Sequence, residues 1–82
     1  MAIMMREKKE FYVITFATTT AALAMEKSCG DDGIPGRLIP VPREITAGCG
    51  LAWRIAVDEY DSYEMMIKDL GIDFEGIVRL WI

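Results

Sequence analysis

The fold class is decided by one stretch, Glu10-Phe-Tyr-Val-Ile-Thr-Phe-Ala17, and by the residues that follow it. β-branched and aromatic residues dominate this stretch, which is typical of a strand buried on both faces and therefore central in its sheet. Thr18-Thr-Thr20 then offers hydroxyl caps before a run of good helix formers, Ala21 to Lys27. We expect this helix to run to about Asp32 and to end at Gly33, a left-handed C-cap.

The next two elements predicted are strands. Arg37-Leu-Ile-Pro-Val41 is short and apolar, and Pro40 cannot donate a hydrogen bond to a neighbouring strand, so this segment belongs at a sheet edge. Leu51-Ala-Trp-Arg-Ile-Ala-Val57 alternates large with small or polar residues at the two-residue period of a strand. Between them, Pro42 to Gly50 shows no periodicity and is predicted to be a loop.

A second helix and a last strand complete the chain. Asp61-Ser-Tyr-Glu64 has the pattern of a capping box, and Tyr63, Met66, Ile67 and Leu70 then trace one helical stripe that stops at Gly71. Ile77-Val-Arg-Leu-Trp-Ile82 follows as a closing strand. The order βαββαβ predicts a ferredoxin-like α+β fold, a four-stranded antiparallel sheet with two helices on one face and the first and third strands central. Residues 1–82 are expected to form a single domain, with 1–9 a loosely ordered N-terminal segment.

Composition and charge restrict the possible partners. With 82 residues, of which 52% are apolar, the chain has more apolar surface than a small lone domain buries, so we expect a homo-oligomer or partner docking. The net charge of -4 and the absence of a basic cluster argue against nucleic acid. Because no apolar run approaches the roughly 20 residues of a membrane span, and no secretory signal is evident, we expect a cytoplasmic protein without a membrane partner.

The chain contains no His and no Cys-x-x-Cys, which argues against the usual catalytic and metal-binding chemistry, so we expect neither a metal nor a cofactor. Its candidate reactive group is the thiol of Cys49, which Gly48 and Gly50 leave unshielded, while Arg43 and Arg54 lie near it in sequence and could support a thiolate. The alternative is an inert cysteine in a glycine bulge.

Two further features bear on the chemistry. Cys29 shares the apolar face of the first helix with Ala22 and Met25, which predicts an inert core residue. Thr19 and Thr20 lie at the start of that helix, where they would serve as caps or, through the backbone amides, as an anion site. Both cysteines are expected to be thiols.

Several motifs together resemble a known family: Tyr12-Val-Ile-Thr-Phe16, Thr19-Thr20 with Ala22-Leu-Ala-Met-Glu-Lys27, Gly33-Ile-Pro-Gly-Arg-Leu-Ile-Pro-Val-Pro-Arg43, and Ala47-Gly-Cys-Gly-Leu51. The family is a domain of unknown function described as selenium/sulfur carrier-like, and the resemblance covers most of residues 11–80. The resemblance favours a carrier over an enzyme. In such a carrier, Cys49 would hold sulfur or selenium as a persulfide-type adduct. Sulfur or selenium donor and acceptor proteins would be its partners.

This sequence departs from the better-understood sulfur carriers, which use a Cys-Pro-x-Pro motif at a helix start, because Cys49 is followed by Gly50 and then by a strand. Exchange at sulfur still requires only an accessible thiolate and a partner. Two other functions stay open. One is a binding or assembly module that docks through a sheet edge or face, helped by Trp81 and Ile82, and the other is a redox sensor in which Cys49 is oxidised.

Overall fold

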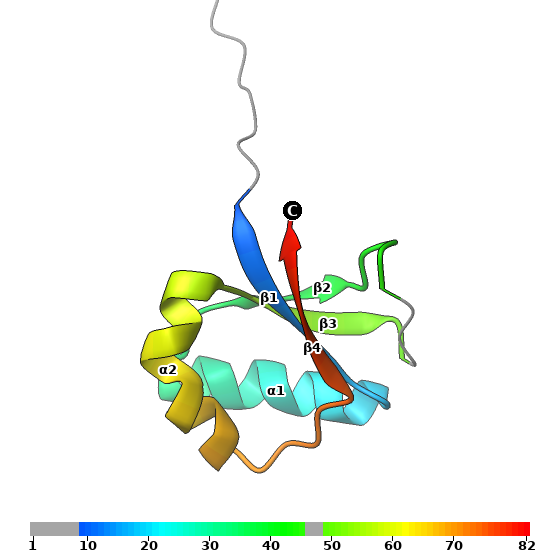
Figure 1. Ribbon diagram of the computed structural model, residues 1–82. Helices are drawn as coiled ribbons and strands as arrows, with labels where there is room; N and C mark the ends of the chain where they lie inside the picture. Colours follow the sequence, from blue (N-terminus) through cyan, green and yellow to red (C-terminus); the bar gives the residue numbers. More distant parts are fainter. Residues whose placement is uncertain (1–8, 46–48) are drawn as a thin grey trace, which may run out of the picture.

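A computed structural model of the protein describes residues 9–45 and 49–82. The elements, in chain order, are β1 (Glu10–Thr15), α1 (Thr19–Asp32), β2 (Arg37–Pro40), β3 (Leu51–Ala56), α2 (Val57–Asp69) and β4 (Gly76–Trp81). The strands form one antiparallel sheet in the order β2-β3-β1-β4 (Figure 1). This confirms the ferredoxin-like fold with the first and third strands central. The single domain stays a prediction, and residues 1–8 of the predicted N-terminal segment lie outside the described part.

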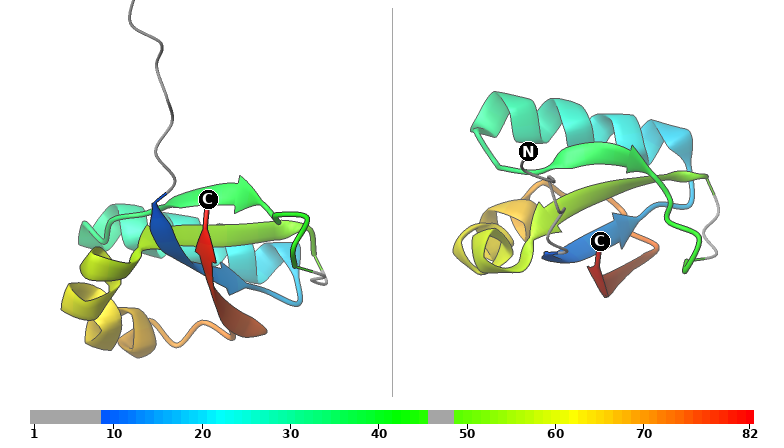
Figure 2. Two further views of the ribbon diagram at one scale, coloured as in Figure 1. Left: turned by 45° about the horizontal axis from the view of Figure 1, so that its top comes forward. Right: turned by 90° about the horizontal axis from the view of Figure 1, so that it is seen from above.

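Both helices pack against the same face of the sheet (Figure 2). The core lies between these two layers and combines alternate residues of the central strands with one stripe from each helix: Ile14, Phe16, Trp53, Ile55, Ala22, Met25, Cys29, Tyr60 and Ile67. Because successive strand residues point to opposite faces, Phe11, Val13 and Arg54 belong to the face that no helix covers. Val78 and Leu80 of β4 stand opposite Val13 and Phe11, so the uncovered face is largely apolar.

Helix α1 agrees with its predicted signals. The Thr18 hydroxyl accepts a hydrogen bond from the Ala21 amide at 3.1 Å, which satisfies one of the unpaired donors of the first turn. Gly33 ends the helix with a φ of 70°, the left-handed conformation expected of it. The side chains of Met25 and Cys29 are fully buried, as the three- and four-residue spacing predicted.

Helix α2 begins earlier than predicted. It starts at Val57, directly after β3, and its N-cap residue Ala56 makes no side-chain hydrogen bond. The prediction of a start at the Asp61–Glu64 capping box was therefore wrong. Asp58 and Glu59 place negative charge in the first turn, which favours a helix start there through the helix dipole.

The buried stripe of α2 differs accordingly from the one predicted. The buried residues of α2 are Tyr60 and Ile67, which are seven positions apart. The Tyr60 ring packs at a tilt against that of Tyr12 in β1, with ring centroids 4.7 Å apart. Met66, which the sequence placed on the packed stripe, is exposed. Ile67 of the predicted stripe is thus in the core, and Tyr60, which precedes the predicted helix, joins it there.

The two edge strands of the sheet are β2 and β4. Pro40 lies at the end of β2, an edge strand, as predicted from its missing amide hydrogen. At the other edge, Arg79 of β4 forms a bidentate ion pair with Glu10 of β1, with Nη2 and Oε1 2.8 Å apart. This guanidinium lowers the pKa of Glu10, and the pair ties the edge strand to the centre of the sheet.

Candidate functional site

Cys49 lies at the end of the loop that joins β2 to β3, two residues before Leu51 begins the strand. Gly50, between them, has a φ of 81°, and its carbonyl accepts a hydrogen bond from the Val41 amide at 3.0 Å. This bond extends the β2–β3 pairing past the last ladder residues and fixes where the cysteine stands. Gly48, which the sequence also singled out, lies outside the described residues.

The thiol of Cys49 is half-buried and faces the helical side of the sheet. Its S–H donates to the Leu51 carbonyl oxygen at 3.4 Å, and its side chain packs against the edge of the core cluster. The residue is therefore only partly exposed, and its thiol proton is directed to a backbone acceptor.

The two predicted supporting arginines lie in different places. Arg54 belongs to the uncovered face, where its guanidinium carbon stands 4.5 Å from the centroid of the Phe11 ring, a cation–π contact. This geometry does not bring it to Cys49, which packs on the helical side. Arg43 is exposed in the turn after β2, which the Ile45 amide closes by donating to the Pro42 carbonyl at 3.0 Å. The support of a thiolate by either arginine stays a prediction.

Thr19 and Thr20 are exposed in the first turn of α1, after the N-cap residue Thr18. Thr18, Thr20 and Asp73 are among the residues that line a hollow of about 360 Å³. The negative charge of the Asp73 carboxylate would repel a bound anion. The anion site at Thr19 and Thr20 stays a prediction. Because Thr15 of β1 pairs with the start of β3, this helix turn lies at the same end of the sheet as the cysteine loop (Figure 1).

Cys29 is the contrasting thiol. It is fully buried on α1 within the core, as predicted, and burial raises its pKa to about 11, with the Asp32 carboxylate adding to the effect. A thiol that is sealed in the core and stays protonated is neither accessible nor nucleophilic near neutral pH. The two cysteines therefore differ in burial: Cys29 is buried, as predicted, and Cys49 is half-buried.

The buried thiol makes stability depend on alkaline pH. Because the pKa of Cys29 is higher in the folded state than the roughly 8.5 of a free cysteine, its contribution is fully present below that value and is lost as pH rises toward about 11. We expect the free energy of unfolding, from urea titrations at pH 8 to 10.5, to fall by up to about 1.4 kcal/mol per pH unit from this group.

The control is Cys29→Val, which keeps an apolar side chain of similar size and removes the titration. Burial also raises the pKa of Tyr60, which contributes to the slope of both proteins. The valine variant should therefore show a shallower, but not flat, decline. Equal slopes for the two proteins would contradict the account of Cys29.

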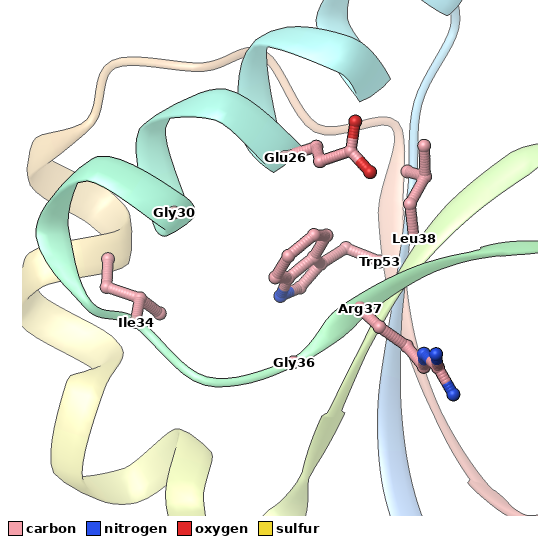
Figure 3. A pocket seen from close by; sticks show the side chains of 7 residues that line it. All are labelled: Glu26, Gly30, Ile34, Gly36, Arg37, Leu38 and Trp53. Atoms are coloured by element: carbon pink, nitrogen blue, oxygen red, sulfur yellow. The ribbon is translucent and has the colours of Figure 1, made fainter.

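A second hollow of about 360 Å³ lies at the opposite end of β2, beside Trp53. The sequence predicted only that Trp53 belongs to a strand, and it assigned no functional role to Glu26, Gly30 or Gly36, which also line this hollow (Figure 3). No group of His, Cys, Asp and Glu side chains within residues 9–45 and 49–82 is arranged to hold a metal ion. In the same part of the chain, neither helix has the length and apolar content that a membrane crossing requires.

Comparison with known proteins gives one match. A protein-family model described as "Putative Se/S carrier protein-like" matches residues 11–79, which is most of the chain and includes Cys49. No curated protein and no solved structure matches.

Proposed function

Because the chain belongs to this Se/S carrier protein-like family, we propose that it is a non-enzymatic carrier that holds one sulfur or selenium atom on Cys49. The observation that carries the proposal is the difference between its two thiols. Cys29 is fully buried with a raised pKa, whereas Cys49 stands half-exposed at the end of a loop. If the chain carries a chalcogen on a thiol, Cys49 is the residue with access to a donor.

The transfer step is an exchange at sulfur without net oxidation. The Cys49 thiol gives its proton to solvent, and the resulting thiolate attacks the terminal sulfur of a donor persulfide, R–S–S–H. A bond forms between Cys49 Sγ and that sulfur while the donor S–S bond breaks, which leaves a persulfide on Cys49 and the donor thiolate R–S⁻. The same step with R–S–Se–H gives a selenium adduct, and the reverse step on an acceptor thiol unloads it.

The local geometry suits a site that loads by contact with another protein. To react, the thiol has to break one weak hydrogen bond, to the Leu51 carbonyl, since its anchoring backbone contact is made by Gly50. The exposed Arg43 turn and the first turn of α1 lie at the same end of the sheet. We propose that sulfur or selenium donor and acceptor proteins dock at this end, where the exposed Arg43 offers a positive charge to an incoming persulfide.

Sulfur loading can be measured directly. The protein is incubated with a cysteine desulfurase and L-cysteine, and its intact mass is then determined without reductant. The parent protein should gain the mass of one sulfur atom, and a reducing agent should remove it. Cys49→Ser, which changes only the sulfur, should gain none, whereas Cys29→Val should load like the parent because its thiol is sealed in the core.

Two results would overturn the carrier proposal. One is an adduct that persists in Cys49→Ser, and the other is a parent protein that stays unmodified although a small alkylating reagent reaches Cys49. A parallel incubation with a selenocysteine lyase and selenocysteine distinguishes the cargo, since the mass gained differs between the two elements.

A further inference from the structure

Strand β4 has the sequence of a buried strand but lies at the edge of the sheet. Ile77-Val-Arg-Leu-Trp81 is apolar apart from Arg79, and a nearly continuous apolar run is typical of a strand that is covered on both faces. Ile77, Val78 and Trp81 are nevertheless 42%, 36% and 61% exposed. The strand order β2-β3-β1-β4 also leaves the outer edge of β4 without a neighbouring strand.

The helical layer does not reach β4. Helix α1 packs mainly on β3 and β2, and α2 packs mainly on β1 and β3 (Figure 2). Ile77 stands opposite Ile14, a core residue, so Ile77 and Trp81 lie on the helical side of the sheet and are still exposed there. Within the described residues, β4 contributes none to the core cluster. Its apolar side chains are therefore open on both faces.

The two edges of the sheet differ in how they are protected against pairing with another strand. The shorter edge strand, β2, begins at the exposed Arg37 and ends at the exposed Pro40, and both charged residues and proline discourage pairing at an edge. The longer edge strand, β4, has one charged residue between its ends, Arg79, and the Glu10 carboxylate of β1 binds it. The β4 edge is therefore the one that can accept another strand.

Backbone groups at this edge are directed outward at every second residue. The Ile82 amide donates to the Lys9 carbonyl oxygen at 3.1 Å, so the backbone of Ile82 is directed towards β1. Because these groups alternate along an antiparallel strand, Ile77, Arg79 and Trp81 direct their N–H and C=O groups away from β1. A row of such groups is a template for an extended strand, so the occupant of this edge is a strand.

We propose that two copies of the chain pair their β4 strands in antiparallel fashion about a two-fold axis at Arg79. This register places Val78 opposite Leu80 of the second copy, and Ile77 opposite Trp81 of the second copy. Every side-chain pair away from the axis is then apolar on both faces, and cross-strand apolar pairs stabilise a sheet. The strand is thus complementary to itself, which selects a second copy as the occupant.

The two arginines at the axis are compatible with this pairing. Each Arg79 guanidinium is bidentate on Glu10 of its own chain and lies 5.9 Å from the centroid of the Tyr12 ring, so it is drawn over β1 and away from the axis. A shift of the register by two residues in either direction would separate the arginines, but it would leave either Ile77 or Trp81 without an apolar partner.

The pairing also extends the apolar part of the uncovered face from one sheet into the other. In each chain Phe11 stands opposite Leu80, and Val13 stands opposite Val78. With Leu80 opposite Val78 of the second copy, these four positions form one apolar row across the dimer. Because a single strand and its side chains make the contact, the interface is smaller than the about 800 Å² per partner of a standard complex, and the dimer should be weak.

This interface is separate from the cysteine. Cys49 belongs to the loop between β2 and β3, and β2 and β4 are the opposite edges of the sheet. The proposal therefore does not rest on sulfur carriage and can fail or hold independently of it.

The dimer is tested by sedimentation equilibrium of the full chain at about 5 µM to about 500 µM, with a reducing agent present so that Cys49 cannot join two chains. We expect the average molar mass to rise from 9.2 kDa towards twice that value as the concentration increases. The mass of a single chain over the whole range rejects the second copy and leaves a strand of another protein as the occupant.

Two variants remove the interface by different means. Trp81→Lys places a charge at an exposed position of β4, and Ile77→Pro removes an outward-directed amide hydrogen. Each should keep the circular dichroism spectrum of the parent and have the mass of a single chain at the highest concentration. Leu23→Lys is the matched control and should dimerise like the parent, because Leu23 is 49% exposed on α1, which packs on β3 and β2. Undiminished dimers in the two β4 variants, or an equal loss in Leu23→Lys, reject this interface.

Cysteine cross-linking tests the register. Residue 78 of one copy and residue 80 of the other form a non-hydrogen-bonded pair with Cα atoms about 4.5 Å apart, which a disulfide can span. Val78→Cys and Leu80→Cys are each made together with Cys49→Ser, then mixed and treated with a mild oxidant, and intact masses show which chains are joined. The mixture should give the mixed disulfide, and neither variant alone should cross-link. A mixture without the mixed disulfide, or equally fast cross-linking of one variant to itself, overturns the register.

Discussion

Replacing Gly36 by alanine is expected to cost about 2–5 kcal/mol of folding free energy and to leave the protein largely unfolded. Two independent costs add at this position. Gly36 has a φ of 125°, which L-residues rarely adopt, and an added Cβ would stand 2.6 Å from the Arg54 carbonyl oxygen and 2.7 Å from Trp53 Cε2. Neither neighbour can move freely, since one is backbone of a central strand and the other is a buried ring.

Gly30→Ala is the matched control, because it makes the same chemical change in open space. A Cβ at Gly30 meets nothing within 4 Å, and the residue lies inside α1, where alanine is favoured over glycine by about 0.5–1 kcal/mol. We expect urea unfolding followed by circular dichroism to show Gly30→Ala more stable than the parent and Gly36→Ala far less stable. Similar stabilities for the two variants would contradict the close approach of Gly36 to Trp53.

Truncating Phe16 to alanine should cost about 3–5 kcal/mol, the range for a fully buried phenylalanine. Phe16 is fully buried where β1 leads into α1, and it meets Phe74 edge to face with ring centroids 5.9 Å apart. A core of this size supplies roughly 3–5 kcal/mol in total, so the alanine variant should be mostly unfolded in the absence of denaturant.

The milder substitution Phe16→Leu keeps the prediction measurable, at an expected loss of about 1–1.5 kcal/mol in the same urea experiment. Phe11→Leu is its control, because Phe11 lies in β1, five residues before Phe16, but on the uncovered face, half-exposed beneath Arg54. The loss at Phe11 should be clearly smaller. If it equals the loss at Phe16, the core does not lie on the helical side alone.

Much of the fold could be predicted because its signals are local. The apolar density of residues 10–17, the hydroxyl caps before α1, the left-handed Gly33 and the edge proline Pro40 each depend on a few neighbouring residues. The predicted start of α2 was wrong because the local signal for it is ambiguous. The Asp61–Glu64 pattern is compatible with a helix start but also with a helix interior, and burial of Tyr60 against β1 favours the longer helix.

The site could be predicted only in part. Strand alternation already sets Arg54 apart from Leu51 and Trp53, but no local pattern says to which face the preceding Cys49 turns. The hollow beside Trp53 depends on the register that pairs Arg37 with Arg54 and so brings Gly36 against the indole. Contacts between residues this far apart in the chain are fixed by tertiary packing, and a single sequence gives no sign of them.

The burial of Cys29 has a consequence for any atom carried on Cys49. A second thiol within reach would let the molecule discharge itself by closing an internal disulfide, but this one is shut inside the core and holds its proton. A chain that carries a sulfur or selenium atom on Cys49 would therefore keep it until the thiol of an acceptor protein attacks it. The rate of transfer would then depend on how often the two proteins meet.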